Sequence, residues 1–143
     1  MTDFSTRAIH LKALKKDPFG TLNFPVYDSV AFEFDTAEEL ALAFEGKKPS
    51  HIYSRITNPT VENFEQKIKS VTGASSVAAV SSGMAAIANL IITIMQNGEN
   101  IVTTKHLFGN TYSLLEKTLK PWGLKTKYTD LTDASSIKRL IDE

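Results

Sequence analysis

Hydrophobic and polar positions follow a regular pattern from about residue 59 onward and a much less regular one before it. Short apolar or alternating runs predict three strands, at residues 76–80, 100–104 and 124–129. Between and after these runs, apolar residues spaced three and four apart predict helices. A strand–helix order of this kind implies parallel strands joined by right-handed crossovers. The pattern therefore predicts an α/β fold with a mainly parallel sheet and helices on both faces.

Capping residues mark where the predicted helices begin and end. Asn58 followed by Pro59 is a typical helix start, and Gly73 is a typical stop. The next helix, residues 84–95, is apolar nearly all round, which predicts burial in a core. We expect the helix at 84–95 to end by Gly98. The third helix is expected to be capped by Asn110 or Thr111 and to end at Pro121–Gly123, and the fourth to begin at Asp133.

The first 58 residues have little regular pattern and predict a single helix. Thr36 and Glu39 fit a capping box at its start, and Gly46 marks its end. The apolar residues before this helix predict an extended arm that packs on the body of the protein or on a partner subunit; they are Leu22, Phe24, Val26 and Tyr27. We therefore expect an arm at residues 1–58 and the first part of an α/β domain at 59–143, cut in mid-helix.

The amino-acid composition excludes several kinds of site and partner. Sixteen Lys and Arg balance sixteen Asp and Glu among 143 residues, so we expect no nucleic-acid partner and no polybasic membrane patch. The lack of cysteine excludes disulfides, thiolate metal sites and cysteine nucleophiles, and favours a cytoplasmic protein. The apolar run at 84–95 is shorter than the roughly 20 residues of a membrane span. His10, His51 and His106 lack metal-ligand spacing, so no metal site is predicted.

One candidate site is the turn that leads from the first predicted strand into the second predicted helix. Gly83 permits a sharp turn, and the first N–H groups of a helix, here those of Gly83 and Met84, favour an anion such as phosphate. Such a turn is also often only a helix cap. It is not a Walker loop, because no Gly-Lys-Ser/Thr follows it.

Two further motifs could add to such a site. Tyr53 and Arg55 lie in irregular chain just before a helix and could hold a phosphate, or lie on the surface without a ligand. Phe108 follows the second predicted strand and could lie face-on to a planar ligand, or be a core residue under a loop. Trp122 lies between a proline and a glycine and is expected to cover the edge of the sheet.

Taken in order, YSRITNPT at 53–60, SSGMAAI at 81–87 and LFGNTY at 107–112 resemble the Cys/Met-metabolism family of pyridoxal 5'-phosphate (PLP) enzymes. This family includes cystathionine synthases and lyases, methionine γ-lyase, and the homoserine-ester sulfhydrylases. The resemblance covers essentially the whole chain. It implies PLP as cofactor and the first part of a large PLP-binding domain of the type I aminotransferase kind.

The resemblance assigns roles to five residues. Gly83 and Met84 would offer backbone N–H groups to the PLP phosphate. Phe108 would stack on the pyridine ring, where the family more commonly has a tyrosine. Tyr53 and Arg55 would reach the phosphate bound in a neighbouring subunit. The resemblance therefore implies a homo-oligomer, a tetramer at full length, with active sites shared between two chains.

The family's Schiff-base lysine, within a Ser-x-Thr-Lys motif, is expected to lie after residue 143. Lys105 and Lys127 each follow a threonine, but they come too early in the family's order and are expected to be solvated. The aspartate that pairs with the pyridine nitrogen and the arginine that binds the substrate carboxylate are expected beyond the chain as well. We therefore expect no catalytic residue within these 143 residues.

The resemblance implies a reaction in methionine biosynthesis: γ-replacement on an activated homoserine, with O-acetylhomoserine and sulfide giving homocysteine. Within the same family, a methionine γ-lyase or a cystathionine γ-synthase or lyase is the alternative. An alternative of another class is a catalytically incompetent fragment that only folds and self-associates.

Overall fold

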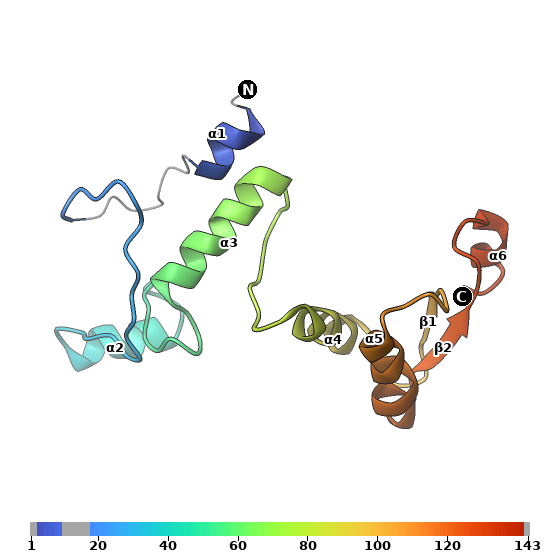
Figure 1. Cartoon of the computed structure of the whole chain (residues 1–143). Coiled ribbons are helices and arrows are strands. Elements are labelled where there is room, and N and C mark those ends of the chain that lie inside the picture. Colours follow the sequence, from blue (N-terminus) through green and yellow to red (C-terminus); the bar gives the residue numbers. More distant parts are fainter. Residues whose placement is uncertain (1–2, 10–17, 142–143) are drawn as a thin grey trace. The chain divides into compact units, whose positions relative to one another are not determined.

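The computed structural model describes residues 3–9 and 18–141 (Figure 1). Contacts group the chain into two compact units, the first ending at Ala79 and the second beginning at Val80. The boundary between these units does not coincide with the change of sequence pattern near residue 59. The division into an arm at 1–58 and part of a catalytic domain at 59–143 stays a prediction about the complete protein.

Within the described residues, the first unit contains helices α1 (Phe4–Ile9), α2 (Ala37–Phe44) and α3 (Pro59–Thr72). Helix α1 is missing from the sequence-based prediction, which was wrong to expect a single helix before residue 59. It packs on α3, where the Arg7 guanidinium donates to the carbonyl of Ser70 at 2.8 Å. A helix this short depends on such a tertiary contact, which no local pattern reveals.

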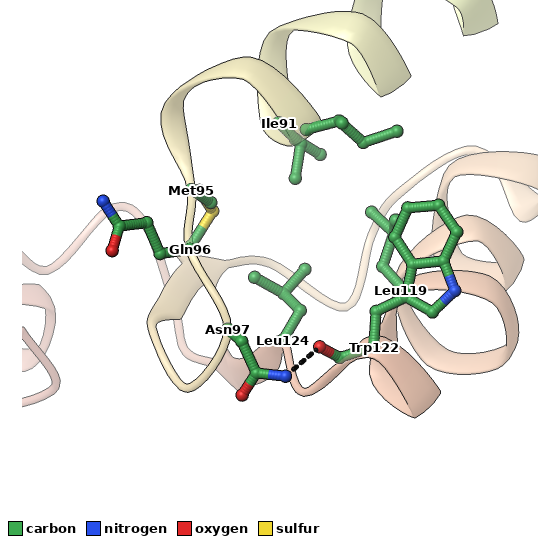
Figure 2. A pocket seen from close by; sticks show the side chains of 8 residues that line it. Ile91, Met95, Gln96, Asn97, Leu119, Trp122 and Leu124 are labelled. Carbon is green, nitrogen blue, oxygen red and sulfur yellow. Dashed lines mark hydrogen bonds between the residues drawn. The ribbon is translucent and has the colours of Figure 1, made fainter.

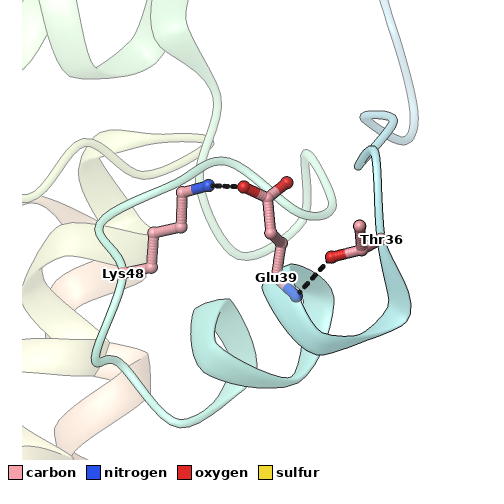
Figure 3. Close-up of polar contacts among 3 residues, drawn as sticks. All are labelled: Thr36, Glu39 and Lys48. Carbon is pink, nitrogen blue, oxygen red and sulfur yellow. Dashed lines mark hydrogen bonds and ion pairs between the residues drawn. The ribbon is translucent and has the colours of Figure 1, made fainter.

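Side-chain caps form at the starts of α2 and α3, where the sequence predicts them. Thr36 Oγ1 accepts the N–H of Glu39 at 3.1 Å (Figure 3). The Glu39 carboxylate turns to the ammonium of Lys48 at 2.5 Å, so only half of the capping box forms. The hydrogen bond from Lys48 lowers the pKa of Glu39 below its usual value. At α3, Asn58 is the N-cap, and Gly73 ends the helix with φ +74°.

The second unit begins with α4 (Gly83–Ile94) and contains a parallel pair of strands, β1 (Asn100–Thr103) and β2 (Lys125–Tyr128). Asn100 lies opposite Lys125, and the register continues to Thr103 opposite Tyr128. This parallel pair confirms the second and third predicted strands and the α/β class. The other elements are α5 (Gly109–Ser113), the π-helical η1 (Leu114–Leu119), the 3₁₀ turn η2 (Lys120–Trp122) and α6 (Ala134–Lys138).

The helix for which the sequence predicts Asn110 or Thr111 as the cap begins at Gly109, so its cap lies two or three residues earlier than predicted. Its N-cap is Phe108, whose side chain makes no capping hydrogen bond, so neither of the expected polar caps is used. The stop is as predicted, because Gly123 ends η2 in the left-handed region. Asp133 caps α6 by accepting the N–H of Ser135 at 2.9 Å, also as predicted.

The strand predicted at 76–80 is wrong: this segment is extended but pairs with no strand among the described residues. The N–H of Ala79 donates instead to the carboxylate of Glu65 on α3, at 2.7 Å. An apolar run without charge reads as a buried strand, but a strand exists only where a neighbour supplies its hydrogen bonds. The two-stranded sheet of this unit does not extend to that segment.

A small hydrophobic core holds the second unit together, formed by buried side chains of α4, η1 and the residue just before β2: Ile91, Leu115, Leu119 and Leu124. The expectation that α4 is buried on nearly all sides is wrong for this chain. Only Ile91 of that helix is buried, while Leu90 and Ile94 are largely exposed. The described residues therefore cover one face of α4 and leave an apolar face in contact with solvent.

Gly123 occupies a position that disfavours any residue with a side chain. Its φ is +95°, and a Cβ there would lie 2.6 Å from Oδ1 of Asn97, whose amide donates to the carbonyl of Trp122. We expect Gly123→Ala to lower the free energy of unfolding by about 2–3 kcal/mol, from left-handed strain and the lost hydrogen bond. Urea denaturation measures this.

Gly98 supplies the matched control, because it has φ +94° but open space around its Cβ position. Gly98→Ala carries the backbone strain alone and should cost about 1–2 kcal/mol. Equal losses for the two variants would show that the close approach of Asn97 to Gly123 has no energetic weight.

Candidate functional site

The turn before α4 leaves two backbone donors open. Ser82 is the N-cap: its Oγ accepts the N–H of Ala85 at 3.1 Å, and its carbonyl accepts that of Ala86. Among the described residues, no acceptor pairs with the N–H of Gly83 or of Met84. A Cβ on Gly83 would meet nothing within 4 Å, so the space beside this residue is open. Two unpaired N–H groups at the positive end of a helix are suited to an anion.

Phe108 belongs to the same unit and is exposed. Its side chain is 75% accessible at the start of α5, so the prediction of a core residue under a loop is wrong. Helix α5 contacts the first turn of α4, where the hydroxyl of Thr111 donates to the sulfur of Met84 at 3.6 Å. The loop with Phe108 and the turn with Gly83 are thus held by neighbouring helices.

Tyr53 and Arg55 lie together in the first unit, in the irregular segment before α3. The Arg55 guanidinium carbon lies 5.1 Å from the centroid of the Tyr53 ring, within the range of a cation–π contact. Both side chains are exposed. Within the described part of the chain, Arg55 has no carboxylate partner, so its charge is available to an anion.

The segment that carries Tyr53 and Arg55 is fixed to the chain around residue 30. Tyr53 forms an antiparallel bridge with Ala31, and Ser54 donates its N–H to the carbonyl of Val30 at 2.9 Å. The buried Asn58 amide donates to the carbonyl of Tyr27 at 3.1 Å as well as capping α3. The sequence indicated Asn58 only as a cap, because its second partner is distant in sequence.

The two lysines considered above differ from each other. Lys105 is exposed, as predicted. Lys127 is half-buried in β2, and its ammonium donates to the carbonyl of Leu140 at 3.0 Å, so the expectation of a solvated lysine was wrong. Leu140 lies just after α6, so this hydrogen bond ties β2 to the chain that follows that helix.

That Trp122 covers the edge of the sheet stays a prediction. This residue is mostly exposed and, together with Asn97 and Met95 near the end of α4, lines a cavity of about 190 Å³ (Figure 2). The Asn97 amide donates to the Trp122 carbonyl at 2.8 Å and closes one side of it. The indole therefore lies beside the C-terminal end of α4.

Within the described ranges 3–9 and 18–141, no group of three or more His, Cys, Asp or Glu residues lies close enough together to hold a metal ion. His51 lies 3.2 Å from a carboxylate oxygen of Glu62. His106 is exposed, and His10 lies outside the described residues. None of the described helices has the length and hydrophobicity needed to span a membrane.

Residues behind Phe108 form a network that sequence reasoning missed. The Tyr128 hydroxyl donates to Glu116 at 2.9 Å, and Lys120 pairs with the other oxygen of that carboxylate at 2.9 Å. The rings of Tyr112 and Tyr128 stack with centroids 5.7 Å apart. The four residues come from helix and strand, and only the spacing of Glu116 and Lys120 was visible in the sequence.

Comparison with known proteins shows which protein family the chain belongs to. The profile of the family "Cys/Met metabolism PLP-dependent enzyme" matches residues 5–143. The chain belongs to this family. The resemblance drawn from the three motifs is therefore confirmed, and the phosphate of the family's PLP cofactor is an anion of the kind that the turn before α4 suits.

Individual members of the family are similar along nearly the whole chain. O-succinylhomoserine sulfhydrylase of Pseudomonas aeruginosa is 33% identical, over 93% of this chain and 33% of that protein. O-acetyl-L-homoserine sulfhydrylase of Corynebacterium glutamicum is 38% identical, over 91% of this chain and 30% of that protein. L-methionine gamma-lyases of other bacteria have comparable identity.

A solved structure has the same fold. It is described as an O-acetylhomoserine (thiol)-lyase of Campylobacter jejuni with N'-pyridoxyl-lysine-5'-monophosphate, and it superposes with a TM-score of 0.90 at 30% identity. The match covers 99% of this chain and 35% of that one. The chain thus spans about a third of the length of the relatives it matches.

Proposed function

We propose that this chain forms the N-terminal part of a PLP-dependent enzyme of sulfur amino-acid metabolism. When bound, PLP supplies the electron sink for chemistry next to the amino group of an amino acid. The observation that carries the proposal is the pair of unpaired N–H groups on Gly83 and Met84, in a unit that also exposes Phe108. Membership of a PLP-dependent family supports the phosphate of PLP as the anion they would hold.

Backbone and side-chain groups of the second unit would bind the two ends of this cofactor. Gly83 and Met84 would each donate one hydrogen bond to the phosphate, while Ser82 stays engaged in capping α4. The Phe108 ring, exposed at the start of α5, would stack on the pyridine ring. Because phenylalanine has no hydroxyl, Phe108 would position the ring and would hold or move no proton.

Tyr53 and Arg55 would reach the phosphate of a neighbouring subunit's cofactor. The unpaired guanidinium of Arg55, held on the Tyr53 ring, supports this role because phosphate is a strong partner for arginine. The exposed apolar side chains of residues 19–30, among them Phe19, Leu22 and Val26, would be covered in the same assembly. The complete protein would then be a homo-oligomer, a tetramer in our proposal, located in the cytoplasm.

For the reaction, we favour γ-replacement: O-acetylhomoserine and sulfide give homocysteine and acetate. The relative at 38% identity, an O-acetyl-L-homoserine sulfhydrylase, supports this choice of substrate. The L-methionine gamma-lyases among the relatives support γ-elimination as the second candidate, and a cystathionine γ-synthase or lyase belongs to the same alternative. The incompetent-fragment alternative has no relative that favours it.

The experiment is an assay of the natural gene product that contains this chain, purified with PLP. With O-acetylhomoserine and sulfide, we expect stoichiometric homocysteine and acetate. Release of a 2-oxo acid instead would identify the elimination reaction. A gene product that has the mass of these 143 residues alone and forms neither product would support the incompetent fragment.

Neither Lys105 nor Lys127 should be the lysine that anchors PLP. The exposed Lys105 has no feature that activates its amine, and the Lys127 ammonium is engaged with the Leu140 carbonyl. We expect borohydride treatment of the 143-residue chain with PLP to leave no stoichiometric pyridoxyl group on either residue. Peptide mass mapping would reveal one, and a full equivalent on Lys105 or Lys127 would refute this assignment.

A further inference from the structure

Helix α5 and the π-helical turn η1 are tied to strand β2 by one hydrogen bond and one ring stack. The Tyr128 hydroxyl donates to Oε1 of Glu116 on η1 at 2.9 Å. The Tyr128 ring also stacks on Tyr112 of α5, with centroids 5.7 Å apart and 30° between the planes. Both contacts come from a single half-buried side chain, so Tyr128 fixes two points along the helix that begins just after Phe108.

The hydrogen bond between Tyr128 and Glu116 has a protonated donor and an ionised acceptor throughout the neutral pH range. Burial and the bond to Glu116 raise the pKa of Tyr128 to about 12, so the phenol keeps its proton. Hydrogen bonds from Lys120 and Tyr128 lower the pKa of Glu116, so the acceptor stays a carboxylate. A neutral donor and an ionised acceptor make a charge-assisted bond, which is among the stronger hydrogen bonds.

The first turn of this helix also contacts the turn before α4. The Thr111 hydroxyl donates to the sulfur of Met84 at 3.6 Å, on the residue whose N–H is open. Phe108 is the N-cap of this helix, and its carbonyl accepts the N–H of Tyr112 at 3.1 Å. Its position relative to Gly83 and Met84 is therefore set by how the helix behind it is held.

We propose that Tyr128 is a positioning residue that sets, through Glu116 and Tyr112, the placement of the Phe108 ring over a planar ligand whose phosphate lies at Gly83 and Met84. This inference rests on the function proposed above. It adds that strand β2, which contributes no group to the phosphate turn, determines the tilt of the bound pyridine ring. Loss of the Tyr128 hydroxyl should therefore disturb the ring and leave the phosphate contacts unchanged.

The experiment compares Tyr128→Phe with the wild-type 143-residue chain, using inorganic phosphate and PLP as separate probes. Phosphate affinity should stay within about twofold of the wild type, because its donors are untouched. PLP affinity should fall about twofold to tenfold, the range expected when ring stacking is lost. At saturating PLP, the circular dichroism induced in the pyridoxal band should also decrease, which a loss of stability alone would not cause.

Two further variants test whether the effect comes from the hydrogen bond between Tyr128 and Glu116. Glu116→Gln removes the charged acceptor and should reproduce the Tyr128→Phe spectrum, whereas Lys120→Met removes only the exposed partner of Glu116 and should leave the wild-type spectrum. An unchanged spectrum and affinity in Tyr128→Phe, with PLP binding normally to the wild type, would overturn the positioning role alone. Failure of the wild type to bind either probe would overturn the proposed site, and the positioning role with it.

Discussion

Gly83→Pro should reduce the affinity of the chain for PLP and for inorganic phosphate by roughly tenfold to a hundredfold. Proline has no N–H, so one of the two open donors is deleted, and a hydrogen bond to a charged group is worth about 1.5–3 kcal/mol. Proline is well tolerated at the first position of a helix, and Ser82 before it is already extended, with φ −162° and ψ 163°. Titration calorimetry with each ligand measures the loss.

Gly83→Ala is the matched control. Alanine retains the N–H, and its Cβ would project into open space. The affinity for both ligands should therefore remain within about twofold of the wild type. If the proline and alanine variants bound equally well, the N–H of Gly83 would not be a ligand to the phosphate, and the site would have to lie elsewhere.

Leu115→Ala should have the largest effect on stability, lowering the free energy of unfolding by about 2–5 kcal/mol. Leu115 is 1% exposed and lies at the centre of the cluster with Ile91, Leu119 and Leu124. Truncation removes buried methyl groups and leaves a cavity that the surrounding helices fill only in part. Urea denaturation, followed by the fluorescence of Trp122 in the same unit, reports the change.

Leu90→Ala makes the same chemical change on a side chain that is 60% exposed. It should alter the free energy of unfolding by no more than about 0.5 kcal/mol. Similar losses for the two variants would mean that the second unit is not organised around Leu115. They would also weaken the argument that η1 is a fixed support for α5.

Local sequence signals predicted the structure correctly at positions where one residue acts only on its near neighbours. The caps at Thr36 and Asn58 and the stops at Gly73 and Gly123 form as predicted, because each depends on the conformation of a few adjacent residues. The parallel pair β1–β2 also follows from its pattern. Helix α1 and the unpaired segment 76–80 depend on distant partners, so a local pattern could not decide them.

In the candidate site, too, only the features that depend on neighbouring residues could be predicted from the sequence. The open N–H groups at Gly83 and Met84 were predictable, because any helix leaves its first donors unpaired unless a side chain caps them. The exposure of Phe108 was not predictable from an aromatic residue in a loop, which suits a core equally well. The bond between Tyr128 and Glu116 links a strand to a π-helical turn, and no periodicity relates the two positions.

The most direct test of the account is a titration of the ¹⁵N-labelled 143-residue chain with PLP, followed by amide resonances. We predict that the N–H signals of Gly83 and Met84 shift most among the described residues and saturate together, and that inorganic phosphate moves the same two signals. The largest shifts at Lys105 and His106 instead, or no change at Gly83 and Met84 at saturating ligand, would contradict the central claim that the start of α4 binds the cofactor phosphate.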